Sequence, residues 1–232
     1  GGFKRLAWMI GAPFALLVLI LRVTRTEAAS ALVGGICGMF AGILLVVGPS
    51  ILRIDFKQDL ARMDMLRSYP LRGINLLVGT LLAPVLLLTA IEWMLLVAFA
   101  VLVGGVAGEA SSWGPAPSTI ALTGAILAVP MTWVASLVHN AALLLMPAWV
   151  SLGPSRTSGV ERIGQGLFTT IGLVLVMALS LAPAALIFAV SWLLCSSFMG
   201  GAASLPVSAL PAAAALAMEC WLGVALLGAY LD

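Results

Sequence analysis

The chain has 232 residues, of which 62% are hydrophobic and only 9% are charged. A soluble domain of this size could not bury so much apolar surface, so the composition indicates an integral membrane protein. The net charge is only +2, and acidic residues are interleaved with the basic ones, which argues against a nucleic-acid-binding protein.

Six stretches are long and apolar enough to cross a bilayer, which takes about 20 residues of helix. They cover residues 6–21, 28–52, 76–103, 119–150, 166–195 and 205–230. No stretch has the pattern of a strand. The predicted fold class is therefore all-α, a polytopic membrane helical bundle that forms one transmembrane domain over residues 1–232. Because the first residue is Gly1 and no signal-peptide pattern is visible, we expect a fragment of a longer protein.

Two of these stretches carry residues that affect helix packing. Residues 28–52 contain Gly34, Gly38 and Gly42 at intervals of four, which predicts close approach of another helix on that face. Residues 119–150 contain Pro130 and Pro147, which predict a kinked or broken helix.

The segment 53–73, between the second and third stretches, holds five of the eleven Lys and Arg residues. Arranged as a helix, it has one apolar stripe, formed by Leu52, Phe56, Leu60, Met63 and Leu66. Charged residues occupy the rest of its circumference, and Pro70 ends it by disfavouring a helical Tyr69. We expect an amphipathic helix at the membrane surface that either anchors the loop or docks a cytosolic partner.

The basic residues also predict the orientation. With six spans, nine of them fall on one side: Lys4, Arg5, Arg53, Lys57, Arg62, Arg67, Arg72, Arg156 and Arg162. Only Arg22 and Arg25 fall on the other. Since cytoplasmic loops carry the Lys and Arg excess, both chain ends and the amphipathic helix should be cytoplasmic, in a multi-pass protein of the inner (cytoplasmic) membrane.

Three ionisable residues lie inside the apolar spans: Glu92, His139 and Glu219. Such residues are costly in a membrane unless they face a cavity or a partner, so each is a candidate for a polar site within the membrane, together with Asn140 beside His139. The structural alternative is a neutral carboxyl hydrogen-bonded between helices, and a histidine satisfied by a carbonyl or by Asn140.

No constellation of residues indicates an enzyme. A phosphate-binding GxxxxGK[ST] loop needs a lysine, and Lys4 and Lys57 lack that context. There is no GxSxG motif, and Ser136, three residues before His139, is too weak a pairing to predict a nucleophile. One histidine and three cysteines without CxxC spacing predict no metal site. We expect no catalytic residue, metal or bound cofactor in this chain.

Two blocks of the sequence resemble the permease (transmembrane) subunits of bacterial ABC-type exporters. The first is GPSILRIDFKQDLARMDMLRSYPLRG followed by LLAPVLLLTAIEW, and the second is HNAALLLMPAWVSLGPSRTSGVERIGQG. The matching positions of the first block are Arg53, Asp55, Phe56, Lys57, Asp59, Leu60, Leu66, Pro70 and Leu71. Those of the second are Asn140, Pro147, Ala148, Trp149, Gly153, Glu161, Gly164 and Gln165. One departure is Thr80, where the family pattern would place a glutamate.

The resemblance implies a transport permease without its own ATPase site. ATP would be hydrolysed by a separate cytosolic nucleotide-binding subunit, and two permease units or halves would pair. The loop helix would couple the ATPase to the membrane helices through Arg53, Asp55, Phe56, Lys57, Asp59, Leu60, Arg62 and Pro70.

Two other functions are consistent with the residues. A proton-coupled secondary transporter would use Glu92, His139 or Glu219 to carry protons. A non-transporting membrane anchor subunit would need none of them. The sequence does not indicate the substrate.

Overall fold

The computed structural model describes residues 16, 27–52, 73–107, 115–145 and 159–231. These ranges contain the helices α2 (Glu27–Leu52), α5 (Gly73–Ala107), α6 (Pro117–Leu145), α7 (Gly159–Met199) and α8 (Ser204–Leu231). All five are long and apolar enough to cross a membrane. The prediction of an all-α, multi-pass membrane bundle is therefore confirmed for the described residues. The predicted span 6–21, apart from residue 16, and the amphipathic helix predicted after Leu52 lie outside them.

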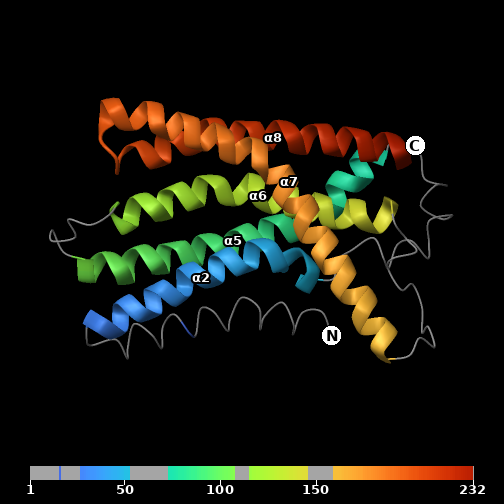
Figure 1. The fold of residues 1–232 in the computed structure, drawn as a ribbon, viewed down its shortest axis with the longest axis horizontal. Helices are drawn as coiled ribbons and strands as arrows, with labels where there is room; N and C mark the ends of the chain where they lie inside the picture. Colours follow the sequence, from blue (N-terminus) through green and yellow to red (C-terminus); the bar gives the residue numbers. More distant parts are fainter. Residues whose placement is uncertain (1–15, 17–26, 53–72, 108–114, 146–158, 232) are drawn as a thin grey trace.

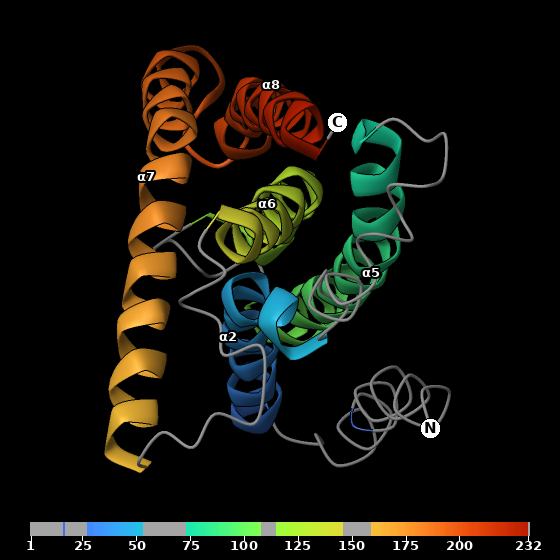
Figure 2. The same ribbon diagram turned by 90° about the vertical axis from the view of Figure 1, so that its right-hand side faces the viewer.

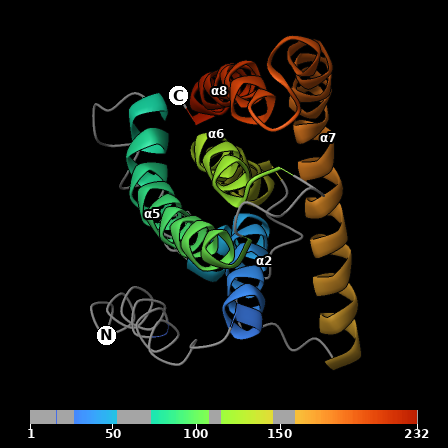
Figure 3. The same cartoon turned by 90° about the vertical axis from the view of Figure 1, so that its left-hand side faces the viewer.

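Helix α6 occupies the centre of the bundle. It packs against α2, α5, α7 and α8, and its apolar stretch is more buried than that of any other described helix. Figures 2 and 3, which look along the bundle, show α6 surrounded by these four helices. A side chain on α6 can therefore contact a partner on almost any side, whereas most of the apolar surface of the outer helices faces outward.

The core is formed mainly where α5, α6 and α8 meet. One buried cluster joins Leu77 and Leu81 of α5 to Leu137 of α6 and to Val224 and Leu227 of α8. A second cluster lies where α6, α7 and α8 meet, and it consists of Val134, Ala184, Leu216 and Cys220. The outward faces carry exposed leucine, isoleucine and valine side chains, which suits contact with lipid.

Helix α7 extends beyond the predicted span 166–195. It has 41 residues and begins at Gly159, so the polar residues Glu161, Arg162 and Gln165 are helical. The length of an apolar run predicts only the part of a helix that can lie in the hydrocarbon of the membrane. The helix itself can continue beyond that part into polar sequence, as α7 does. Figure 1 shows that α7 changes direction along its length, with its C-terminal limb beside α8. Pro183 accounts for the bend, because it removes the hydrogen bond to the carbonyl of Leu179.

Of the two alternatives predicted for the stretch 119–150, a kink or a break, the break is wrong at Pro130. Helix α6 is continuous from Pro117 to Leu145, and Pro147 lies outside the described residues. A proline inside a helix removes one backbone N–H and one hydrogen bond, and in a membrane bundle the neighbouring helices hold the remaining turns in place. Each of the other four helices also continues through one internal proline: Pro49, Pro84, Pro183 and Pro211.

The glycines predicted to pack a neighbouring helix do so in part. A Cβ atom added at Gly34 would lie 3.1 Å from Leu102 Cβ on α5, and one at Gly38 would lie 3.2 Å from the ring of Phe99. Gly42 has no such contact; its neighbour Ala41 is buried instead. Because a helix turns 100° per residue, positions four apart drift around it, and the face that meets α5 passes from Gly34 to Ala41 and Gly48.

The helices alternate in direction, which determines the ends at which their connections lie. Figure 1 shows the C-terminal ends of α2, α6 and α8 and the N-terminal ends of α5 and α7 at one end of the bundle. The chain segments 53–72 and 146–158 connect helices at this end. They hold six of the eleven basic residues, and Arg162 in the first turn of α7 adds a seventh. By the distribution of positive charge, we expect this end to be cytoplasmic, and we call it the basic end.

Labelling of single cysteines tests this orientation. After removal of Cys37, Cys195 and Cys220, the variants Gln58→Cys and Ser158→Cys should be shielded from a membrane-impermeant thiol reagent in intact cells. Ser111→Cys should react, because residues 108–114 connect α5 and α6 at the opposite end. Labelling of Gln58→Cys without labelling of Ser111→Cys would show that the predicted orientation is wrong.

Candidate functional site

Glu92 is buried in the interface between α5 and α6, with 1% of its surface exposed. Its neighbours Leu88 and Ile91 on α5 are buried apolar residues. Arg162 is the sole Lys or Arg among the described residues, and Glu92 forms no ion pair with any described residue. A carboxyl group in such surroundings is stable only as a hydrogen-bonded group, because an unpaired buried charge costs far more.

Thr132 of α6 supplies that hydrogen bond. Its hydroxyl Oγ1 lies 2.8 Å from Glu92 Oε2 and 2.7 Å from the carbonyl oxygen of Ala128, and the side chain is fully buried. The contact joins residues 40 positions apart and links the two helices in the interior of the bundle. The Glu92–Thr132 pair is thus the polar contact that fixes α5 on α6 at this depth.

Other buried polar groups continue from this pair along the interface. Ser136 and Asn140 follow Thr132 at intervals of four residues, so all three lie on one face of α6. Asn140 Nδ2 donates to the carbonyl oxygen of Ser136 at 2.8 Å. Four buried side-chain oxygens have no partner in the described part of the chain: Thr89 Oγ1, Glu92 Oε1, Ser136 Oγ and Asn140 Oδ1. We call Thr89, Glu92, Thr132, Ser136 and Asn140 the polar strip.

The polar strip is costly in a membrane bundle unless it has a use. A buried polar group without a partner costs about 1–3 kcal/mol, and the interior of a bilayer offers no water to replace the partner. Free hydrogen-bonding capacity at several neighbouring positions can bind a proton, ordered water or a polar part of a substrate. The strip is therefore the candidate functional site of the described residues.

The predicted polar residues are only partly brought together. Glu92 and Asn140 belong to the polar strip, and His139, next to Asn140 on α6, is half-buried. Glu219 lies half-buried on α8, and no hydrogen bond joins it to Glu92 or His139 within the described ranges. Ser136 Oγ has no partner there either, so Ser136 and His139 form no nucleophile–base pair. The coupling residues Arg53, Asp55, Phe56, Lys57, Asp59, Leu60, Arg62 and Pro70 lie outside the described residues.

Sequence reasoning missed Thr89, Thr132 and the role of Ser136. The available signal was the spacing of Thr132, Ser136 and Asn140, which places three polar side chains on one face of an otherwise apolar helix. At Thr80, where the resembling family would carry a glutamate, the hydroxyl donates to the carbonyl oxygen of Leu76 at 2.9 Å. That hydroxyl is thus satisfied within its own helix.

On the other side of Glu92, toward the N-terminus of α6, the same interface has no free polar atom among its described residues. Trp93 Nε1 donates to the carbonyl oxygen of Ala125 at 3.0 Å, and Leu96 packs on Gly124. The Thr123 hydroxyl donates to the carbonyl oxygen of Thr119 at 2.7 Å, but Thr123 lies nine residues before Thr132 and so on the opposite face of α6. The Trp93 hydrogen bond and the packing of Leu96 on Gly124 close the described interface in this direction.

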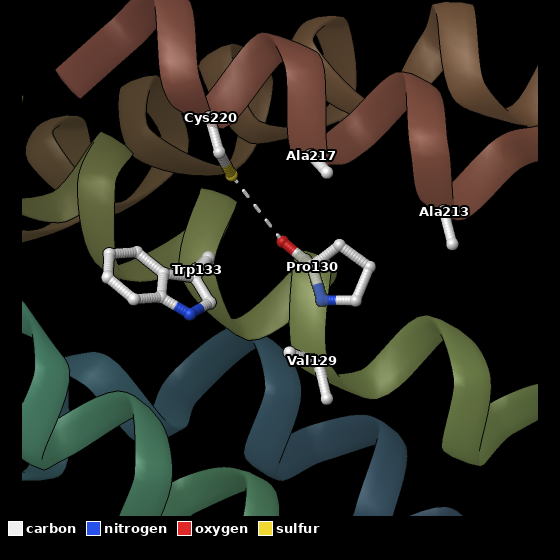
Figure 4. A pocket seen from close by; sticks show the side chains of 6 residues that line it. All are labelled: Val129, Pro130, Trp133, Ala213, Ala217 and Cys220. Carbon is white, nitrogen blue, oxygen red and sulfur yellow. Dashed lines mark hydrogen bonds between the residues drawn. The ribbon is translucent and has the colours of Figure 1, made fainter. Parts of the chain in front are cut away.

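A groove of about 320 Å³ lies on the opposite face of α6, where α8 crosses it. Figure 4 shows its lining residues Val129, Pro130, Trp133, Ala213, Ala217 and Cys220. The Cys220 thiol lies 3.8 Å from the carbonyl oxygen of Pro130, and the remaining lining is apolar. The groove can accept an apolar group. Within the described ranges, no three His, Cys, Asp or Glu side chains are grouped so that they could hold a metal ion.

No family model, curated protein or solved structure matches this chain. The resemblance to exporter permeases therefore stays a prediction from the two sequence blocks.

Proposed function

We propose that this chain is the membrane permease component of an ATP-driven, ABC-type exporter. It would move a substrate that is not yet identified across the cytoplasmic membrane, while a separate cytosolic subunit hydrolyses ATP. The observation that supports this most is the place of residues 53–72 in the chain. This charge-dense segment, with the exporter-like motif, connects α2 to α5, the two helices of the bundle that pack together most extensively.

This connectivity gives a physical route for coupling. A force applied to residues 53–72 acts on the ends of both helices that the segment connects, α2 and α5. Helix α5 is in turn held to the central α6 by the Glu92–Thr132 pair and by the Trp93 bond to Ala125. Packed helices can slide past one another as rigid elements. A displacement of α5 at the basic end would therefore shift α5 relative to α6 and change the interface that contains the polar strip.

Reversing one charge pair tests the coupling role. The double variant Asp59→Arg with Arg62→Asp keeps the possibility of an ion pair, and exposed pairs contribute only about 0–1 kcal/mol, so expression and membrane insertion should stay near wild type. A docking surface would meet opposed charge, which weakens partner recognition strongly. We expect the purified complex to lose its ATPase subunit or its ATP hydrolysis.

The apolar stripe of the same segment provides the matched control. Phe56→Ser or Leu60→Ser should reduce the amount of folded protein, because these residues would hold the helix at the membrane surface. If the charge reversal leaves both the co-purifying ATPase and ATP hydrolysis unchanged, the segment is only an anchor and the coupling role is wrong.

A proton-coupled secondary transporter is the second candidate, and the burial of Glu92 favours it. Carboxyl groups inside membrane helices are common parts of proton relays. The two candidates differ in their source of energy. Proton uptake into proteoliposomes that contain this protein and no ATPase would support the second candidate over the first.

A further inference from the structure

We propose that Glu92 is a proton-binding site that holds its proton at rest and exchanges it with water through the basic end of the bundle. The observations are the Glu92–Thr132 contact and the one-sided distribution of unpartnered polar atoms around it. This inference does not depend on whether ATP or a proton gradient drives transport.

The hydrogen atoms available at the Glu92–Thr132 contact indicate a neutral carboxylic acid. The Thr132 hydroxyl has one hydrogen, yet two acceptor oxygens lie within 2.8 Å of it, Glu92 Oε2 and the carbonyl oxygen of Ala128. The Ala128 carbonyl cannot supply a second hydrogen. If Thr132 donates to Ala128, only a protonated Glu92 can donate to Thr132 and satisfy both contacts.

The surroundings of Glu92 also favour the neutral form. Helix α5 packs against α2, α6 and α8. The titratable side chains described on those three helices are Cys37, His139, Glu219 and Cys220, and none of them is hydrogen-bonded to Glu92. No described cation faces the carboxyl group, so an ionised Glu92 would be an unpaired charge in the interior of the bundle.

Among the described residues, the buried polar side-chain atoms without a partner outside Glu92 all lie on the same side of it. Ser136 and Asn140 follow Thr132 toward the C-terminal end of α6, at about 6 and 12 Å for a rise of 1.5 Å per residue. Thr89 precedes Glu92 toward the N-terminal end of α5. Both of these helix ends lie at the basic end (Figure 1). In the other direction, Leu96 packs on Gly124, and Trp93 Nε1 donates to the carbonyl oxygen of Ala125.

The described residues therefore offer a proton a polar route away from Glu92 in one direction only. Thr89 and Ser136 hydroxyls have free capacity to accept or donate, and Asn140 Oδ1 can hold a water molecule near the end of the route. The reaction is a transfer of H⁺ from the Glu92 carboxyl to water at the basic end, which leaves the carboxylate in the interface until the proton returns. Since this end is the expected cytoplasmic side, the site would sense cytoplasmic pH.

Infrared difference spectroscopy of the reconstituted full-length protein tests the proton site. At neutral pH, we expect the carbonyl stretch of a protonated carboxylic acid that disappears in Glu92→Gln and persists in Glu219→Gln. Glutamine has nearly the same shape, so the bundle should stay folded. If Glu92→Gln removes no protonated-acid band, Glu92 is ionised and the proposal is overturned.

Hydrogen–deuterium exchange of the same band tests the direction. After transfer to heavy water, the shift of the Glu92 band should be at least severalfold slower in Ser136→Ala than in wild type. The control is Thr123→Val, which removes a hydroxyl from α6 nearer its N-terminus and on the face away from Glu92, and which should leave the rate unchanged. A Thr123→Val rate as slow as that of Ser136→Ala, or an unchanged rate in Ser136→Ala, would contradict exchange through the basic end.

Discussion

Replacing Thr132 by valine is expected to destabilise the folded bundle by about 1–3 kcal/mol. Valine fills the same volume, so the effect does not come from a cavity. It comes from Glu92, which is fully buried and has Thr132 as its sole hydrogen-bonding partner within the described residues. Without that hydroxyl, a carboxyl group stays in the α5–α6 interface with no partner.

The reverse change should cost less. Glu92→Met removes the carboxyl group but leaves the Thr132 hydroxyl bonded to the carbonyl oxygen of Ala128 at 2.7 Å. Adding Thr132→Val to Glu92→Met should therefore cost less than Thr132→Val alone, because no carboxyl group is left unsatisfied.

The comparison needs the unfolding free energies, in mixed micelles, of wild type, Thr132→Val, Glu92→Met and the double variant. Thr132→Ser, which keeps the hydroxyl, is the control and should stay close to wild type. Equal losses for Thr132→Val in the presence and absence of Glu92 would show that the pair contributes nothing to stability.

Gly228→Ala is expected to separate α8 from α5 and to lower stability by about 1–3 kcal/mol. A Cβ atom at this position would lie 2.9 Å from the backbone nitrogen of Ile74 and 3.0 Å from its Cα. Backbone atoms cannot rotate away, so the helices themselves must shift. The shift would disturb the nearby cluster that contains Leu77 and Leu227.

Two other glycines provide matched controls. Gly79→Ala on α5 should be nearly neutral, because no described atom outside its own helix backbone lies within 4 Å of its added Cβ. Gly223→Ala meets only the side chain of Leu137, which can adjust, so its cost should be intermediate. Thermal midpoints of the three variants should follow this order, and a Gly228→Ala midpoint equal to that of Gly79→Ala would show that the α5–α8 contact is looser than described.

The helices could be predicted because a membrane span depends on a local property, the length of an apolar run. The five described helices coincide with five predicted spans, although α7 also includes polar residues that a hydrophobicity criterion omits. The close contact at Gly228 depends on which helices become neighbours. That information is not contained in any single segment.

The candidate site could be predicted only through its charged member. Glu92 stands out because ionisable residues are rare in membrane helices. Thr132 does not, because hydroxyl groups in helices commonly bond to the carbonyl four residues earlier, as Thr80, Thr123 and Ser208 do. Thr132 makes that bond as well, and its second contact with Glu92 follows from the packing of α5 on α6.

ATP hydrolysis by the complex purified through this chain from its native membrane tests the proposed function most directly. The exporter proposal predicts that an ATPase subunit with a phosphate-binding loop co-purifies in a fixed ratio, and that its hydrolysis is lost in the Asp59→Arg, Arg62→Asp variant. A purified complex without ATP hydrolysis, combined with gradient-driven proton uptake that is abolished by Glu92→Gln, would contradict it.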